Sequence, residues 1–124
     1  MRVYATRDDV HPGDMDLRPL VFDVADDTAP EDILRRAADR RWLPSIQGDR
    51  ATWVIGSNEL LAVMAYEWPD LRFMPGLDRR IRNVSRGEGG IQLHFSYLCQ
   101  EDPEVIYRAL WSVKLRPPQL PRNL

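Results

Sequence analysis

The sequence predicts an α+β fold, a mostly antiparallel sheet of about five or six strands with two amphipathic helices packed against it. Several short apolar segments rich in β-branched and aromatic residues are separated by turn-forming residues. Two other segments place apolar residues at helical spacing after a proline-containing start signal. Most of the expected strands follow one another through short turns, which is typical of antiparallel sheets and not of doubly wound parallel ones.

The length of 124 residues fits one domain, because a chain of this size buries roughly two thirds of the surface that its unfolded form exposes. We expect a single domain over residues 1–116 and an extended, proline-rich tail over 117–124. No apolar run approaches the roughly 18 residues that cross a bilayer. The first residues lack the apolar segment of a secretory signal, so we expect a cytoplasmic protein.

The expected element order is β-β-α-β-β-β-β-α. The first two strands are expected at residues 1–5 and 20–25, on either side of the acidic segment TRDDVHPGDMD. The first helix is expected to begin near Thr28, because Thr28 and Glu31 have the spacing of a capping box and Pro30 suits a first turn. Its apolar stripe is formed by Ile33, Leu34, Ala37 and Ala38, and Pro44 is expected to end it.

The middle of the chain is expected to form strands. Residues 51–56 and 60–68 are apolar on both faces and are joined by a Ser-Asn turn, which predicts a hairpin in the centre of the sheet. Residues 70–78 are irregular and contain at most a short strand. Residues 79–85 are expected to form a strand with several charged side chains, ended by turn residues at 86–90.

Residues 91–99 alternate between two faces, as a strand requires. One face carries Ile91, Leu93, Phe95, Tyr97 and Cys99, and the other carries Gln92, His94, Ser96 and Leu98. Cys99 is therefore expected to be buried and unreactive, and it cannot form a dyad with His94 across the sheet. Asp102 and Pro103 then predict the start of a second helix. Its expected apolar stripe is formed by Val105, Ile106, Ala109, Leu110 and Val113.

Charge is distributed unevenly along the chain. The net charge is −2, but residues 1–32 contain nine acidic residues and three arginines, while residues 71–90 contain five arginines and two acidic residues. An acidic chain is a poor candidate for binding nucleic acid through phosphates, which requires a concentrated basic surface. A carboxylate cluster in a loop instead suits a basic protein partner.

The candidate partner-binding residues are Asp8, Asp9, Asp14 and Asp16, joined by Asp26 and Asp27. The first four do not have the spacing of a calcium-binding EF-hand loop, and no second histidine lies near His11, so we predict no metal site. The remaining alternative is a solvated loop whose acidic residues only keep it soluble. The sequence does not decide between that loop and a partner surface.

Few residues outside the acidic segment are candidates for a binding site, and no catalytic residue is predicted. Glu67 follows an apolar strand between two aromatic residues, so a partly buried carboxylate there would indicate a site. Glu67, Trp68 and His94 are the residues of a candidate pocket for a small ligand. The other aromatic residues are expected to pack in the core, and the arginines of 79–86 are expected to protect a strand edge.

The segments WLPSIQGDRATWVIGSNELLAVMAYEW (42–68) and MRVYATRDDVHPGD (1–14) resemble small cytoplasmic bacterial immunity proteins. Such proteins neutralise a cognate toxin by covering its active site. The resemblance implies a protein-binding module that is not an enzyme, that needs no cofactor, and whose partner is a basic toxin domain and not a nucleic acid or a membrane. Two other classes stay open: a small-ligand-binding α+β domain, and an enzyme such as a hydrolase.

Overall fold

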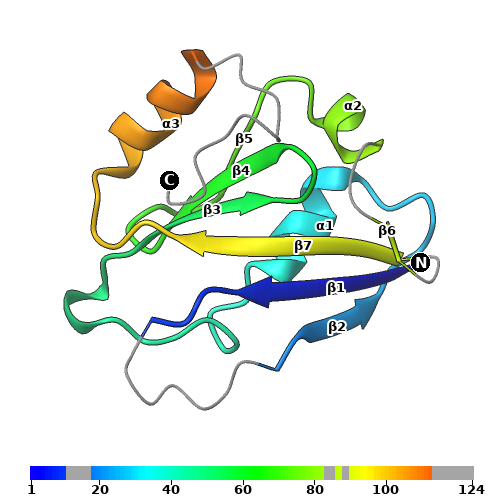
Figure 1. The fold of residues 1–124 in the computed structure, drawn as a ribbon, viewed down its shortest axis with the longest axis horizontal. Helices are drawn as coiled ribbons and strands as arrows, with labels where there is room; N and C mark the ends of the chain where they lie inside the picture. Colours follow the sequence, from blue (N-terminus) through cyan, green and yellow to red (C-terminus); the bar gives the residue numbers. More distant parts are fainter. Residues whose placement is uncertain (11–17, 83–85, 88–89, 113–124) are drawn as a thin grey trace.

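A mixed, mostly antiparallel sheet forms the centre of the computed structural model, which describes residues 1–10, 18–82, 86–87 and 90–112 (Figure 1). Six strands pair in the order β2-β1-β7-β3-β4-β5, and the two-residue β6 pairs with β7. The predicted α+β class is confirmed. The elements are β1 (Arg2–Arg7), β2 (Leu20–Asp23), α1 (Pro30–Ala37), η1 (Gln47–Asp49), β3 (Thr52–Gly56), β4 (Leu60–Ala65), β5 (Arg72–Phe73), α2 (Leu77–Arg82), β6 (Arg86–Gly87), β7 (Gly90–Tyr97) and α3 (Pro103–Ser112).

The predicted central hairpin is present as β3 and β4. The two strands pair antiparallel with Val54 opposite Val63, and the register shifts at Gly56. Residues of both strands are buried on both faces, as expected for the interior of a sheet. The first strand, β1, pairs antiparallel with β2 but parallel with β7, so a strand from the start of the chain lies beside one from the end.

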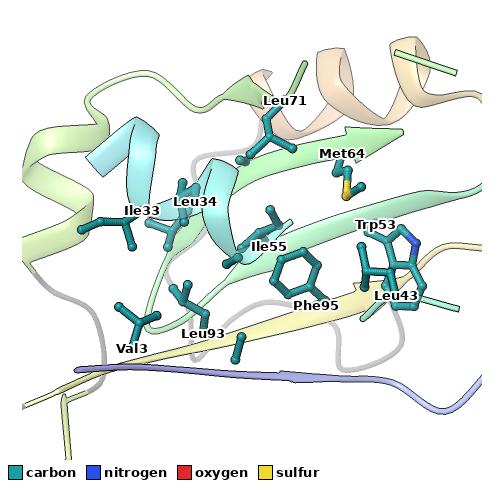
Figure 2. Packing of buried hydrophobic residues seen from close by; sticks show 14 of the residues in the cluster. Val3, Ile33, Leu34, Leu43, Trp53, Ile55, Met64, Leu71, Leu93 and Phe95 are labelled. Atoms are coloured by element: carbon teal, nitrogen blue, oxygen red, sulfur yellow. The ribbon is translucent and has the colours of Figure 1, made fainter. Parts of the chain in front are cut away.

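The sheet is covered by helices on both faces. The larger hydrophobic cluster lies on the α1 side and includes Leu34, Trp53 and Phe95. Figure 2 shows Leu34 on the helix near Ile55 of the sheet, and Trp53 beside Leu43 farther along the strands. A smaller cluster lies on the opposite side of β3 and β4, where Leu110 of α3 packs with Val54. Trp53 and Val54 are neighbours on β3 and point to opposite faces of the sheet, so this strand contributes to both hydrophobic clusters.

The first helix is shorter than predicted and is capped differently. Its N-cap is Ala29, with Pro30 in the first turn, and no side chain caps it. The capping box expected from Thr28 and Glu31 is thus not formed. The helix ends at Ala37 with Ala38 as its C-cap, seven residues before Pro44, which was expected to end it. The amide of Ala38 still donates to Leu34 O, and the chain then turns away through residues 39–42.

The charged segment predicted as a strand at 79–85 forms the short helix α2 over its first half, and residues 83–85 lie outside the described residues. Gly76 has a φ of 72°, a conformation that L-residues rarely adopt and that glycine permits. This turn directs the amides of Arg79 and Arg80 towards Gly76 O. Leu77 is buried in the core and Ile81 is partly buried against it, so both apolar residues of the helix face the core.

The alternation predicted for β7 is confirmed over residues 91–97, but the prediction for Cys99 is wrong. Ile91, Leu93 and Phe95 are buried on one face, while His94 is exposed on the other. Cys99 is exposed and has a φ of 57°, a left-handed turn conformation that takes it out of the strand. Strand periodicity was extended two residues beyond the point where the pairing of β7 ends.

The last helix begins as predicted but presents a different face to the sheet. Asp102 Oδ1 accepts a hydrogen bond of 2.9 Å from the amide of Glu104, so Asp102 caps the helix. Pro103 and Leu110 are buried, whereas Val105 is 61% exposed. Ala109 is also exposed and Val113 lies outside the described residues, so the predicted stripe is only partly correct.

These two helix starts give a matched pair of substitutions. Asp102→Ala removes a cap hydrogen bond and is expected to lower the free energy of unfolding by about 1 kcal/mol. Thr28→Ala removes a side chain that makes no cap contact with α1, and it is expected to change stability by less than about 0.5 kcal/mol. Urea denaturation of the two variants measures both values. Equal losses would mean that Thr28 caps the first helix in solution.

The open edge of the sheet at β2 is protected by an arginine of α1. Arg36 Nη1 donates a hydrogen bond of 2.9 Å to Asp23 O, and its guanidinium lies 4.7 Å from the centre of the Phe22 ring. A charged side chain at an edge strand hinders the addition of a further strand.

Within the described residues, no helix is long and apolar enough to cross a membrane. The predicted tail at 117–124 lies outside them.

Candidate functional site

Asp8 occupies a fixed position directly after β1. Its amide donates to Phe95 O at 3.0 Å, and its Oδ2 accepts from the amide of Tyr97 at 2.9 Å. Its other carboxylate oxygen, Oδ1, lies 2.8 Å from His94 Nε2. The start of the acidic segment is therefore attached to β7 through both main chain and side chain, and Asp8 has a structural role that the sequence did not reveal.

His94 connects Asp8 to a hydroxyl. Its Nδ1 lies 2.7 Å from Thr6 Oγ1, and the side chains of His94 and Asp8 are 45% and 44% exposed. A hydroxyl, an imidazole and a carboxylate in sequence are the groups used in nucleophilic catalysis. Here Thr6 Oγ1 also lies 3.3 Å from Leu93 O, and Asp8 is bonded to the β7 main chain. Thr6 and Asp8 thus each contact the β7 main chain as well as the His94 side chain. These contacts fix the segment after β1 onto β7.

The candidate partner-binding acids lie at two ends of the sheet. Asp9 is exposed beside Asp8, while Asp14 and Asp16 lie outside the described residues. Asp26 and Asp27 are exposed after β2, where Asp26 Oδ1 lies 3.2 Å from the amino group of Met1. Because β2 runs antiparallel to the six-residue β1, roughly 20 Å separate the two groups at about 3.3 Å per residue.

The three residues of the predicted pocket are not brought together. Glu67 follows the end of β4 that pairs with Thr52, whereas His94 pairs with Gly56 at the other end of β3. Glu67 Oε2 accepts from Arg50 Nε at 3.3 Å, which is the ordinary pairing of a carboxylate near a strand end. The prediction placed three residues in one site because two of them are adjacent in sequence, but strand direction separates them from His94.

Trp68 alone of the three lines a cleft, which lies between the end of α1 and the turn that joins β4 to β5. The cleft has a volume of about 270 Å³ and is lined by Arg35, Ala38, Arg40, Met64, Ala65, Tyr66, Trp68, Pro69, Asp70 and Leu71. Its walls come from segments about thirty residues apart in the chain. No local sequence pattern pairs Arg35 or Arg40 with the residues after β4, so the sequence alone did not predict this cleft.

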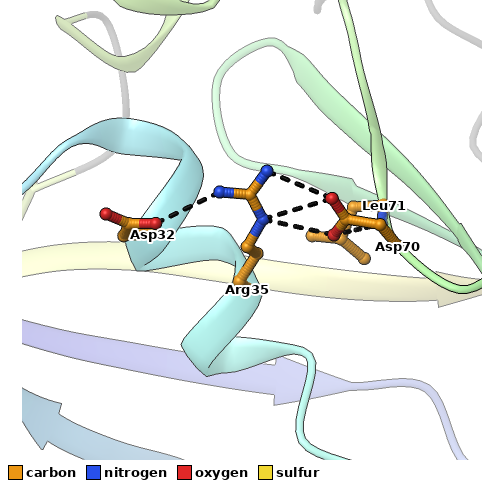
Figure 3. Close-up of polar contacts among 4 residues, drawn as sticks. All are labelled: Asp32, Arg35, Asp70 and Leu71. Carbon is orange, nitrogen blue, oxygen red and sulfur yellow. Dashed lines mark hydrogen bonds and ion pairs between the residues drawn. The ribbon is translucent and has the colours of Figure 1, made fainter.

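One ion pair joins the two walls of this cleft. Arg35 Nη2 lies 3.1 Å from Asp70 Oδ2, and its Nε donates to Asp70 Oδ1 at 3.2 Å, while Nη1 reaches Asp32 (Figure 3). The side-chain hydrogen bond from Arg35, together with the hydrogen bond from the amide of Leu71, lowers the pKa of Asp70.

Tyr66 also lines this cleft. Burial raises the pKa of Tyr66, whose hydroxyl donates to Pro44 O at 2.7 Å.

No protein-family model, curated protein or solved structure matches this chain. Across the described ranges, no group of three or more His, Cys, Asp or Glu side chains lies close enough to hold a metal ion. His11, Asp14 and Asp16 lie outside those ranges, so the absence of a metal from the acidic segment stays a prediction.

Proposed function

We propose that this chain is a protein-binding module of immunity type, which neutralises a cognate bacterial toxin by binding a basic surface of that toxin. The anchored carboxylate of Asp8 carries the proposal. It sits at the end of β1 with its side chain 44% exposed, and the exposed Asp9 follows it. Asp14 and Asp16 extend the same acidic segment in sequence.

Anchoring favours recognition for an entropic reason. A loop that is ordered only on binding loses conformational freedom at that moment, and this loss weakens the complex. The hydrogen bonds of Asp8 to His94 and to the Tyr97 amide fix where the acidic segment leaves the sheet before any partner arrives. The charges that follow are therefore presented from a fixed point.

The charge itself favours a basic partner. Residues 1–32 carry a marked excess of acidic residues over arginines, and such a region attracts a positively charged surface from beyond contact distance. Many toxins that act on nucleic acids carry such a surface. A carboxylate-rich segment competes for it by mimicking phosphate groups, and this electrostatic complementarity raises the association rate more than it raises affinity.

The proposal is tested by protection of growing cells. Each neighbouring open reading frame that encodes a basic domain is expressed from an inducible promoter, with and without this chain. We expect growth arrest that the wild-type chain relieves. The variant Asp8→Asn/Asp9→Asn/Asp14→Asn/Asp16→Asn is expected to protect less, at equal protein level, because it retains side-chain size but loses four charges.

Asp26 and Asp27 lie at the other end of β1 from Asp8, so the proposed surface does not include them, although the sequence placed them among the candidate partner-binding residues. The control for this assay is therefore Asp26→Asn/Asp27→Asn. It is expected to protect nearly as well as the wild type. Arrest that the wild-type chain does not relieve, although the two proteins are produced together, would reject the proposed function for that pair.

A further inference from the structure

We propose that His94 sets the charge that the acidic segment after β1 presents to a basic partner, so that acidification weakens binding there, an inference that rests on the proposed function. Two contacts of the imidazole carry it. His94 Nε2 lies 2.8 Å from Asp8 Oδ1, and His94 Nδ1 lies 2.7 Å from Thr6 Oγ1. Imidazole is the side-chain group that ordinarily changes charge between about pH 5 and about pH 8.

The neutral imidazole of His94 satisfies both contacts in one tautomer. An ionised carboxylate only accepts hydrogen bonds, so the hydrogen of the neutral ring lies on Nε2 and is donated to Asp8 Oδ1. The other ring nitrogen, Nδ1, then accepts from the hydroxyl of Thr6. In this state the ring does not compensate the negative charge of Asp8, and a basic partner meets that charge at the start of the acidic segment.

The protonated imidazolium satisfies the same contacts. Both ring nitrogens then donate, Nε2 to Asp8 and Nδ1 to Thr6. The hydroxyl of Thr6 still has an acceptor for its own hydrogen, because its Oγ1 lies 3.3 Å from Leu93 O. The ring therefore takes up a proton with the anchor in place. Asp8 is then paired with a cation at hydrogen-bonding distance, and the pair attracts a distant basic surface much less than an isolated carboxylate does.

The neighbouring strands do not replace His94 as the source of this pH dependence. In β3, Gly56 lies opposite His94 and brings no side chain. In β1, Arg7 alternates to the core-facing side of the strand, and its Nη1 donates to Asp8 O at 3.1 Å. A guanidinium stays charged in proteins, so Arg7 contributes a constant charge. Asp9 is exposed beside Asp8 and belongs to the surface whose charge is measured.

The second histidine of the sequence, His11, lies outside the described residues but within the acidic segment. Its own titration would add to the pH dependence of binding. The experiment therefore uses the background His11→Gln, in which His94 is the remaining histidine, and compares it with His11→Gln/His94→Gln. Groups other than histidine are shared by the two proteins, so their contribution cancels in the comparison.

The probe is an oligolysine peptide of about ten residues, because lysine ammonium groups keep their charge below about pH 9. Binding is followed by ¹H–¹⁵N NMR of the full chain in about 20 mM salt, at about pH 7.5 and about pH 5.5, which lie on either side of the ordinary titration of imidazole. Saturable shifts are expected at the amides of Asp8 and Asp9. Removal of four charges is expected to slow association at least about tenfold, so the compensation of one charge should weaken binding about twofold.

In the His11→Gln background, the dissociation constant for the peptide is expected to increase about twofold between the higher and the lower pH. In His11→Gln/His94→Gln it is expected to stay constant. The pH at which binding weakens should coincide with the titration of the His94 Cε1 proton in the His11→Gln protein, a comparison that does not depend on the second substitution. The Tyr97 amide, which donates to Asp8 Oδ2, should keep its protection factor against hydrogen exchange at both pH values.

Three results would overturn the proposal. One is the absence of saturable peptide binding at about pH 7.5, the pH at which the imidazole is mostly neutral. Another is an equal pH dependence of binding in the two proteins, which would remove the role of His94 but leave the proposed function to the protection assay and its fourfold variant. The third is loss of the Tyr97 protection at the lower pH, because acidification would then release the segment and not change its charge.

Discussion

Gly90→Ala is expected to lower the free energy of unfolding by on the order of 3 kcal/mol, because forced overpacking of an ordered core typically costs this much. A Cβ atom at Gly90 would lie 2.5 Å from Arg2 O and 3.0 Å from Tyr4 Cε2. The first of these atoms belongs to the main chain and cannot rotate away. Relief of the contact requires β1 and β7 to separate where Arg2 and Gly90 are paired.

The control is Gly56→Ala in the neighbouring strand β3. There the added Cβ would be 3.4 Å from Glu59 O, an ordinary contact distance, so a change of less than about 1 kcal/mol is expected. Chemical denaturation of both variants compares them directly. Equal stability of Gly90→Ala and the wild type would show that β1 and β7 do not pair as closely at this end as the structure describes.

Local sequence patterns predicted the parts of the fold that depend on neighbours in the chain. The β3–β4 hairpin, the alternation of β7 and the Asp102 cap each involve residues within a few positions of one another. The parallel pairing of β1 with β7 joins the two ends of the domain, and no periodicity signals it. The buried face of α3 was also predicted only in part. Its packing against Val54 and Val63 of the sheet decides which of its residues are buried, and the spacing of apolar residues within the helix does not show this contact.

The candidate site shows a similar division. The acidic segment after β1 was visible as a run of carboxylates, but its attachment to His94 spans 86 residues and depends on strand pairing. The cleft was missed for the same reason, since Arg35 and Asp70 are 35 residues apart. Cys99 was misplaced because periodicity does not show where a strand ends. In each case the missing information was tertiary contact.

The second large effect is expected on association with the proposed toxin partner. Replacement of Asp8, Asp9, Asp14 and Asp16 by asparagine should slow association at least about tenfold at low salt, because the long-range attraction is lost. The difference should shrink as salt screens the charges, whose range is about 10 Å at 0.1 M. The melting temperature is expected to stay within about 5 °C of the wild type, because asparagine Oδ1 can still accept from the amide of Tyr97.

The structure makes this expectation position-dependent. Asp26 and Asp27 lie at the other end of β1, roughly 20 Å away at about 3.3 Å per residue, which exceeds the screening length at physiological salt. Their replacement by asparagine removes two charges without altering the segment after β1. A smaller effect per charge is therefore expected for Asp26→Asn/Asp27→Asn than for the fourfold variant.

The central claim, that the carboxylates after β1 form the surface that meets a basic toxin, is tested most directly by stopped-flow association rates. A basic domain that the protection assay identifies as the partner is purified and mixed with the wild-type chain, the fourfold variant and Asp26→Asn/Asp27→Asn. The salt concentrations are about 20 mM and about 300 mM, between which the Debye length falls from roughly 20 Å to roughly 6 Å. The account predicts at least about tenfold slower association of the fourfold variant at low salt and nearly equal rates for all three proteins at high salt. Equal rates of the wild type and the fourfold variant at low salt would contradict it, and the acidic segment would then be a solvated connection between β1 and β2.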